Sequence, residues 1–142
     1  MISYDKDFYS WTQEQAELLR NRQFNSLDLP NLIEEIETMG RSEKRELESR
    51  LTVLLLHLLK WKYQPARRGR SWNLTIKGQR IEYSNILTDN PGLKAQLNTI
   101  LGNAYKLARV KAATQTQLDI DTFPEECPWM IEDITNDNFY PD

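Results

Sequence analysis

The chain is poor in the residues that build most metal and redox centres. Its 142 residues include one cysteine, Cys127, and one histidine, His57. A single cysteine excludes an internal disulfide and suits a reducing compartment, so we expect a cytoplasmic protein. A di-iron helical bundle needs Glu-x-x-His repeats on two helices, which one histidine with Leu54 three residues before it does not supply. The sequence therefore predicts no metal site and no cofactor.

Export signals and long apolar runs are also missing. The N-terminus, MISYDKDFYSW, has neither the basic nor the apolar region of a signal peptide. The longest apolar run falls far short of the ~20 residues that span a bilayer. A net charge of −3 gives no bulk attraction to nucleic acid or to an anionic membrane. We therefore expect a protein with no membrane partner.

No stretch alternates with the period of a strand, whereas helical spacing recurs along the chain. Leu32, Ile33, Ile36 and Met39 are one such group, and Gly40 after them stops or kinks the helix. One continuous helix through Gly40 is the alternative. The predicted fold is all-α, a compact bundle of about five helices in a single domain, 1–142. We expect helices over about 13–22, 29–39, 43–63, 72–87 and 93–115, and a short C-terminal helix over about 128–134.

The expected central helix, about 43–63, contains the most apolar run of the chain, LTVLLLHLLKW from Leu51 to Trp61. A helix that is apolar on nearly every side has to be covered by other elements. One line along it is nevertheless mostly polar, because spacings of four and three place its residues above one another. This polar seam faces solvent or lines a cleft. Its members are Glu46, Arg50, Val53, His57, Lys60 and Gln64.

Arg50 and His57 form the sharpest catalytic candidate. Seven residues are almost two helical turns, so the two side chains point the same way. Histidine is a general acid or base near neutral pH, and arginine stabilises negative charge on phosphorus. The spacing resembles the motif of the HEPN ribonucleases, which are small all-α proteins, although Leu51 stands where those enzymes usually carry a polar residue. We favour a structural histidine that hydrogen-bonds a neighbouring helix.

Charge is distributed in two opposite blocks. Residues 60–80 contain seven basic residues and no acid, whereas residues 112–142 contain eight acids and no Lys or Arg. Basic side chains interleaved with aromatic rings can hold phosphates while bases stack. We favour the alternative, in which the basic block pairs with the acidic tail. The binding candidates in and beside the basic block are Glu46, Lys60, Gln64, Arg67, Arg68, Arg70, Trp72 and Arg80.

Several runs along nearly the whole chain carry a resemblance. They read YDKDFYSWTQEQAELLR, LDLPNLIEEIETMGRSEKRELESRL, HLLKWKYQP, SWNLTI, DNPGLK and CPWMIEDI. Together they resemble a bacterial family, abundant in cyanobacteria, that is catalogued as domain of unknown function number twenty-nine. The resemblance implies a compact helical domain. It implies no activity and no catalytic residues.

Three functions remain open. The favoured one is a non-enzymatic interaction domain that binds an unidentified partner protein or associates with itself, for example as a homodimer, because no coherent catalytic set is present. The second is a HEPN-like, metal-independent ribonuclease that uses Arg50 and His57. The third is a nucleic-acid-binding domain that uses residues 60–80.

Overall fold

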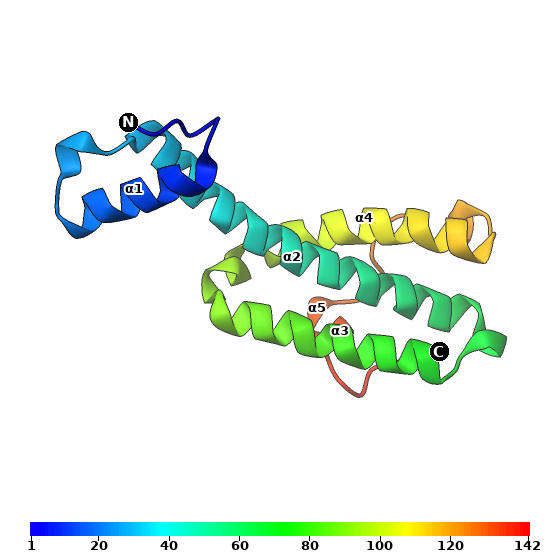
Figure 1. The fold of residues 1–142 in the computed structure, drawn as a ribbon. Helices are drawn as coiled ribbons and strands as arrows, with labels where there is room; N and C mark the ends of the chain where they lie inside the picture. The colour runs from blue at the N-terminus through cyan, green and yellow to red at the C-terminus, as the bar shows by residue number, and fades with distance from the viewer. The chain divides into compact units, whose positions relative to one another are not determined.

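The computed structural model describes all 142 residues and contains helices, turns and loops without a strand (Figure 1). Three-residue or six-residue 3-10 turns occupy the connections. None of the helices combines the length and the hydropathy needed to cross a bilayer. The predicted all-α class is confirmed. The chain forms five helices, since the helices expected over 29–39 and 43–63 are one. These are α1 (Phe8–Arg20), α2 (Leu29–Tyr63), α3 (Arg70–Asp89), α4 (Leu97–Thr116) and α5 (Ile131–Ile134).

Helix α1 begins five residues earlier than predicted. Its N-cap is Asp7, whose carboxylate accepts a hydrogen bond from the Ser10 N–H at 3.1 Å. Thr12 lies inside the helix, and its hydroxyl donates to the carbonyl of Tyr9 at 2.7 Å. The predicted start after Thr12 was wrong because an Asp at the preceding turn satisfies the free N–H groups first.

Helix α2 is continuous over 35 residues, so the predicted stop at Gly40 was wrong and the alternative was right. A glycine inside a helix costs only about 1 kcal/mol relative to alanine. Arg41 supports the helix across this position, since its guanidinium lies 3.3 Å from Glu34 and 3.9 Å from Glu37. The expected central helix, 43–63, is the second part of α2.

The later helices also begin or end away from their predicted limits. Helix α3 starts at Arg70 after an extended Gly69, so Ser71 lies in the first turn and is not the cap. Helix α4 starts at Leu97, because Pro91–Gln96 forms a 3-10 turn first. Helix α5 is only four residues long and starts three residues after Pro128.

The chain groups into two compact units, Met1–Ser42 and Glu43–Asp142. The predicted single domain stays a prediction. In Met1–Ser42, α1 and the first part of α2 form a helical hairpin. The indole N–H of Trp11 donates to Asp28 Oδ2 at 2.9 Å, and the Asp28 N–H donates to Gln15 Oε1 at 2.8 Å. These bonds fix the connection of the hairpin.

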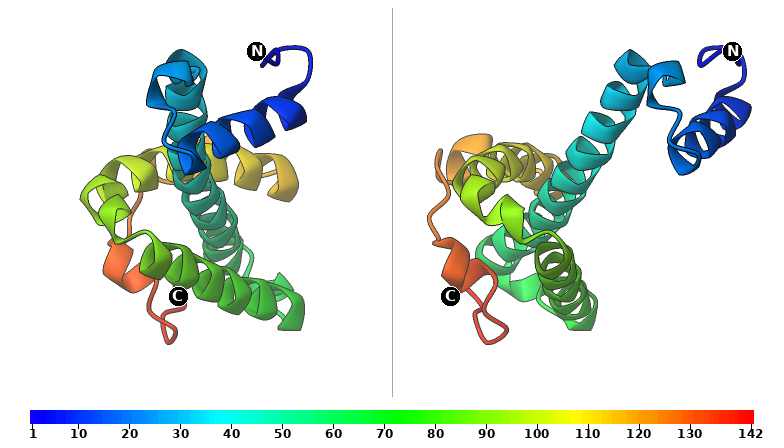
Figure 2. Two further views of the ribbon diagram at one scale, coloured as in Figure 1. Left: turned by 60° about the vertical axis from the view of Figure 1, so that its left-hand side comes forward. Right: turned by 90° about the vertical axis from the view of Figure 1, so that its left-hand side faces the viewer.

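In Glu43–Asp142, the second part of α2 lies at the centre of the core. Figures 1 and 2 show α3 and α4 on either side of it. Seven leucines of α2 are at most 4% exposed, which confirms that other elements cover its apolar run. The chain after α4 completes the core with Phe123 and Ile134. The seven leucines are Leu47, Leu51, Leu54, Leu55, Leu56, Leu58 and Leu59.

Candidate functional site

The polar seam of α2 is half-buried along most of its length. Its first member, Glu46, is exposed, and Arg50, His57, Lys60 and Gln64 are partly covered. The Arg50 guanidinium lies 2.7 Å from Glu46 Oε1, and its Nε also donates to that oxygen at 2.9 Å. This side-by-side contact on one helix holds the charge of Arg50 against a carboxylate.

His57 is held by its own helix. Its Nδ1 lies 2.8 Å from the carbonyl oxygen of Val53, which only accepts, so Nδ1 carries the proton and Nε2 carries the lone pair. Burial lowers the pKa of His57, the bond to Val53 opposes that shift, and the charge of Lys60 adds to it. The ring is therefore neutral at pH 7, with Nε2 as a proton acceptor. No hydrogen bond joins His57 to Arg50, and their catalytic pairing stays a prediction.

Lys60 and Trp72 bring α2 and α3 together beside the seam. The ammonium of Lys60 lies 5.7 Å from the centre of the Trp72 ring, and burial lowers the pKa of Lys60. Both side chains are half-buried. A cation over an aromatic face is attracted by the ring quadrupole, so this contact positions the ammonium without a carboxylate.

Arg68 ties the turn after α2 to the end of the chain. Its Nε donates to the carbonyl of Trp61 at 2.6 Å, and its guanidinium lies 5.4 Å from the centre of the Trp61 ring. Its Nη2 donates to the main-chain oxygens of Pro141 and Asp142 at 3.3 and 3.1 Å. Arg68 therefore contacts the tail through main-chain oxygens.

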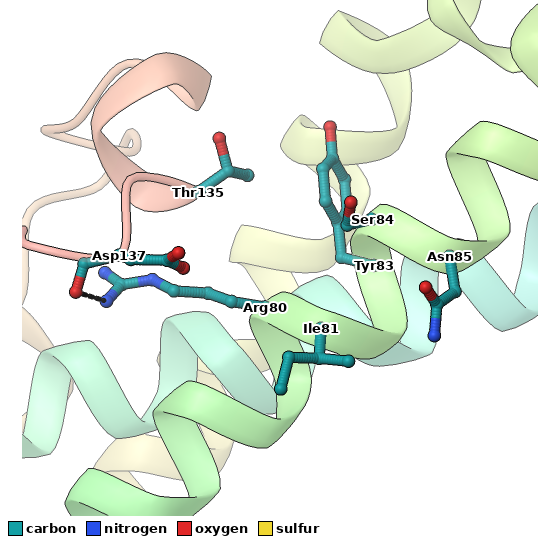
Figure 3. A pocket seen from close by; sticks show the side chains of 7 residues that line it. All are labelled: Arg80, Ile81, Tyr83, Ser84, Asn85, Thr135 and Asp137. Atoms are coloured by element: carbon teal, nitrogen blue, oxygen red, sulfur yellow. Dashed lines mark hydrogen bonds between the residues drawn. The ribbon is translucent and has the colours of Figure 1, made fainter.

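Arg80 is buried on α3 and holds the tail in the same way. Three of its nitrogens donate to the carbonyls of Ile134, Asp137 and Phe139 at 2.9, 3.4 and 2.7 Å. Figure 3 shows the bond to Asp137. Burial lowers its pKa, while Tyr140 and Asp137 oppose that shift. A pocket of about 350 Å³ opens beside it and is lined by Tyr83, Ser84 and Thr135 among others.

The expected pairing of the basic block with the acidic tail is corrected by these contacts. The one ion pair made by an acid of residues 112–142 joins Asp121 to Arg109, which lies outside the basic block. Carbonyl oxygens of the tail satisfy Arg68 and Arg80 instead. The other predicted binding cations, Lys60, Arg67 and Arg70, have no carboxylate within 4.0 Å. Docking of the tail therefore leaves most of the basic block without a counter-charge.

The hairpin of residues 1–42 carries an apolar groove that the sequence did not single out. The groove has a volume of about 310 Å³ and lies between α1 and the first part of α2. The signal was present in the helical spacing of Leu32, Ile36 and Met39. The lining residues of this hairpin groove are Phe8, Trp11, Thr12, Gln15, Ala16, Leu19, Leu32, Glu35, Ile36 and Met39.

Metal-binding side chains do not gather in the fold. No group of three or more His, Cys, Asp or Glu side chains is arranged to hold an ion. Cys127 is half-buried, burial raises the pKa of its thiol, and its Sγ lies 3.4 Å from the carbonyl of Trp129. A thiol held in this protonated state is a weak nucleophile.

Comparison with known proteins gives one match. A family model described as a domain of unknown function, DUF29, covers residues 3–140. No curated protein and no solved structure matches the chain significantly. The bacterial origin expected from the resemblance and the cytoplasmic location stay predictions. Because the family model spans almost the entire chain, the protein belongs to the DUF29 family.

Proposed function

We propose that the chain is a non-enzymatic self-association module in which residues 1–42 dock on the same residues of a second copy. The observation that carries the proposal is the exposed apolar surface of the hairpin. Nine of the fifteen large hydrophobic residues that are exposed in the whole chain belong to Met1–Ser42. Trp11 is the one buried apolar side chain of that unit.

Two helices that bury one apolar side chain lack a core of their own. Short helices are marginal in water and depend on packing of their apolar face. The hairpin groove offers that face, because every large residue in its lining is apolar except Gln15 and Glu35. Glu35 accepts a hydrogen bond from the Tyr4 hydroxyl, which occupies the one charged group in the lining. An apolar partner can therefore cover this surface while Glu35 keeps its hydrogen bond to Tyr4.

The area available matches the needs of a dimer. Six side chains of the hairpin are about half exposed, and four of them line the groove. A large apolar or aromatic residue offers about 200 Å² when free, so one hairpin presents roughly 600 Å². Two copies bury roughly 1,200 Å², which is the lower end for specific interfaces. The six are Phe8 (47% exposed), Leu19 (46%), Leu29 (54%), Ile33 (52%), Ile36 (64%) and Met39 (65%).

A second copy also fits the geometry of a hairpin. Two hairpins that face each other across a twofold axis present the same patch to one another and form a four-helix bundle. Each copy then supplies the layer of apolar side chains that the other lacks. The common interior of such a bundle would contain Ile36 and Met39 from both chains.

Charge makes the proposal sensitive to salt in a specific direction. Residues 1–42 contain eight acids and four basic residues, a net charge of −4. Two copies therefore repel each other, and salt screens that repulsion. We expect self-association to strengthen as salt rises from 50 to 500 mM, unlike the capture of a basic partner.

The test is the mass of the full chain by sedimentation equilibrium from about 1 to 200 µM, a range that spans ordinary dimer affinities. We expect a dimer for the wild type and a monomer for Ile36→Lys, because a lysine at the centre of the patch leaves two unpaired charges in the interface. Circular dichroism reports whether the variant keeps its helices.

The matched control is Ile81→Lys, which replaces an isoleucine of similar exposure, 60%, on α3. This variant is expected to remain dimeric. A wild-type chain that stays monomeric over the whole range would overturn the proposal. So would equal association of Ile36→Lys and wild type.

A further inference from the structure

We propose that residues 60–77 and the chain end packed on them form a binding face for single-stranded nucleic acid. This site lies in Glu43–Asp142 and does not depend on self-association of the hairpin. Its cations are Lys60, Lys62, Arg67, Arg70 and Lys77, which come from the end of α2, the following turn and the start of α3.

The first observation is the absence of ion pairs at these cations. Within Glu43–Asp142 the ion pairs are Arg50 with Glu46 and Arg109 with Asp121, and none involves these five cations. Four of the five are exposed, and Lys60 is half-buried. Cations without an ion-pair partner attract a polyanion, which releases its counterions on binding. The acidic tail forms no ion pair with them, and its contacts with Arg68 and Arg80 run through main-chain oxygens.

The second observation is an open groove beside these cations, with a volume of about 520 Å³. Its lining combines two aromatic rings, two carboxamides, one of the cations and one acid, Asp137. The rings of Trp61 and Tyr140 have centroids 4.9 Å apart, and Lys77 stands at the groove from α3. The lining residues of this aromatic groove are Trp61, Asn73, Lys77, Asp137, Asn138 and Tyr140.

The aromatic groove is fixed before any ligand arrives. Arg68 lies over Trp61, and Arg80 lies over Tyr140, each with its guanidinium carbon 5.4 Å from the ring centre. The Tyr140 hydroxyl donates to Asn73 Oδ1, which orients that carboxamide and leaves its N–H groups free to donate. Such preorganised rings and amides lose little conformational freedom on binding.

Nucleic acid fits this chemistry better than a bare anion. A base offers a flat face to an aromatic ring and an edge of donors and acceptors to carboxamides, while its phosphates meet lysine and arginine. A single strand is required, because bases in a duplex are stacked and paired and cannot enter a groove on the protein surface. The structure therefore assigns bases to the aromatic groove and phosphates to the surrounding cations.

The experiment measures fluorescence anisotropy of a labelled 20-nucleotide oligo-U with the full-length chain. In 50 mM salt we expect a dissociation constant between about 1 and 100 µM, the range of sequence-independent binding. For four phosphate contacts on a single strand, binding is expected to weaken about 20-fold between 50 and 150 mM salt. No binding at 100 µM chain in 50 mM salt would overturn the proposal.

Two double variants test whether binding depends on the cations of this face or on the net charge of the chain. Arg67→Ala with Arg70→Ala removes two exposed cations of the face, and we expect at least a tenfold loss of affinity and a salt slope smaller by about 1.4. The matched control, Lys106→Ala with Lys111→Ala, removes the same charge from the exposed surface of α4. Equal losses in both double variants would show attraction to the chain as a whole and overturn the proposed face.

A second ligand tests the role of the bases. An abasic deoxyribose–phosphate chain of the same length keeps the charge and removes the rings. We expect it to bind at least tenfold more weakly than an oligo-dT of equal length, because each stacked base contributes to affinity. Equal affinity of the two would mean a surface that recognises phosphate alone, and the aromatic groove would then have no place in binding.

Discussion

At the scale of single residues, Arg80 is the side chain on which the end of the chain depends. It is 3% exposed, and it donates to three carbonyls that lie 54 to 59 residues later. A buried guanidinium is costly unless its donors are paired, and these carbonyls supply that pairing. The tail in turn gains a donor for three of its carbonyls from Arg80.

Replacement of Arg80 by methionine is expected to lower the free energy of unfolding by about 3 kcal/mol, because several hydrogen bonds from a charged donor are lost and the carbonyls stay buried. Urea denaturation followed by circular dichroism measures the loss. Lys77→Met, an exposed change one turn earlier on α3, is the control and should stay within about 0.5 kcal/mol of wild type.

The same experiment in 50 and 500 mM salt distinguishes carbonyl acceptors from carboxylates. The loss in Arg80→Met should be equal in both, since hydrogen bonds to carbonyls are buried and weakly screened. A loss that shrinks in high salt would point to an ion pair with the side chain of Asp137.

For single residues, the sequence predicted which side chains share one face of a helix, but not which groups they contact. Spacing placed Arg50 and His57 on the polar seam, but it did not show that Glu46 holds the first and the Val53 carbonyl the second. Arg50 and His57 could each also have bonded to groups far away in the sequence, and spacing along one helix does not show which partner is chosen. Arg80 was predicted as a binding residue because it belongs to a basic block, and its carbonyl partners lie too far along the chain for any local pattern to show.

At the scale of elements, α2 is one helix where the sequence analysis expected two, over 29–39 and 43–63. Apolar periodicity identified the covered part of α2 and most of α3 and α4, since their stripes follow the helical period closely. Helix ends were less predictable, because Asp7 and Thr12 are both good caps and the choice depends on the following turn. Gly40 was read as a break because propensity was weighed without Arg41 and its two carboxylates.

Alanine at position 40 is expected to strengthen this part of α2. A Cβ built there meets no atom within 4 Å, so the change gains helix propensity without a clash. Amide hydrogen exchange over Ile36–Lys44 should slow about 2- to 5-fold, which corresponds to about 0.5–1 kcal/mol.

Gly69→Ala serves as the comparison, because Gly69 is extended and lies outside the helices. It should leave exchange over Ile36–Lys44 unchanged. Faster exchange in Gly40→Ala would indicate that the helix bends at this glycine.

At the scale of the whole molecule, burial is divided very unequally between the two units. Every buried apolar side chain except Trp11 lies in Glu43–Asp142. This division was not predictable from periodicity, because Ile33, Ile36 and Met39 show the same helical spacing as the leucines of the core. A pattern of apolar residues shows that a face needs cover, but not which part of the molecule supplies it.

The fragment Glu43–Asp142 is therefore expected to fold by itself. Its 100 residues hold the whole main core, so its thermal unfolding should remain cooperative with a midpoint within about 5 °C of the full chain. The fragment Met1–Ser42 at low micromolar concentration should unfold without a cooperative transition. An unfolded Glu43–Asp142 fragment would mean that the hairpin contributes to that core.

The contacts of Arg80 also affect when the fold can be completed during synthesis, because Arg80 is made before its partners. The ribosome makes about 5–20 residues per second, so the partners of Arg80 appear roughly 3 to 12 s after it does. During that interval the guanidinium of Arg80 has none of these carbonyls to bind. A nascent chain that stalls before Ile134 would present an open core and become a substrate for chaperones and proteases. Completion of this fold thus waits for residues 134–139, which follow Arg80 by 54 to 59 residues.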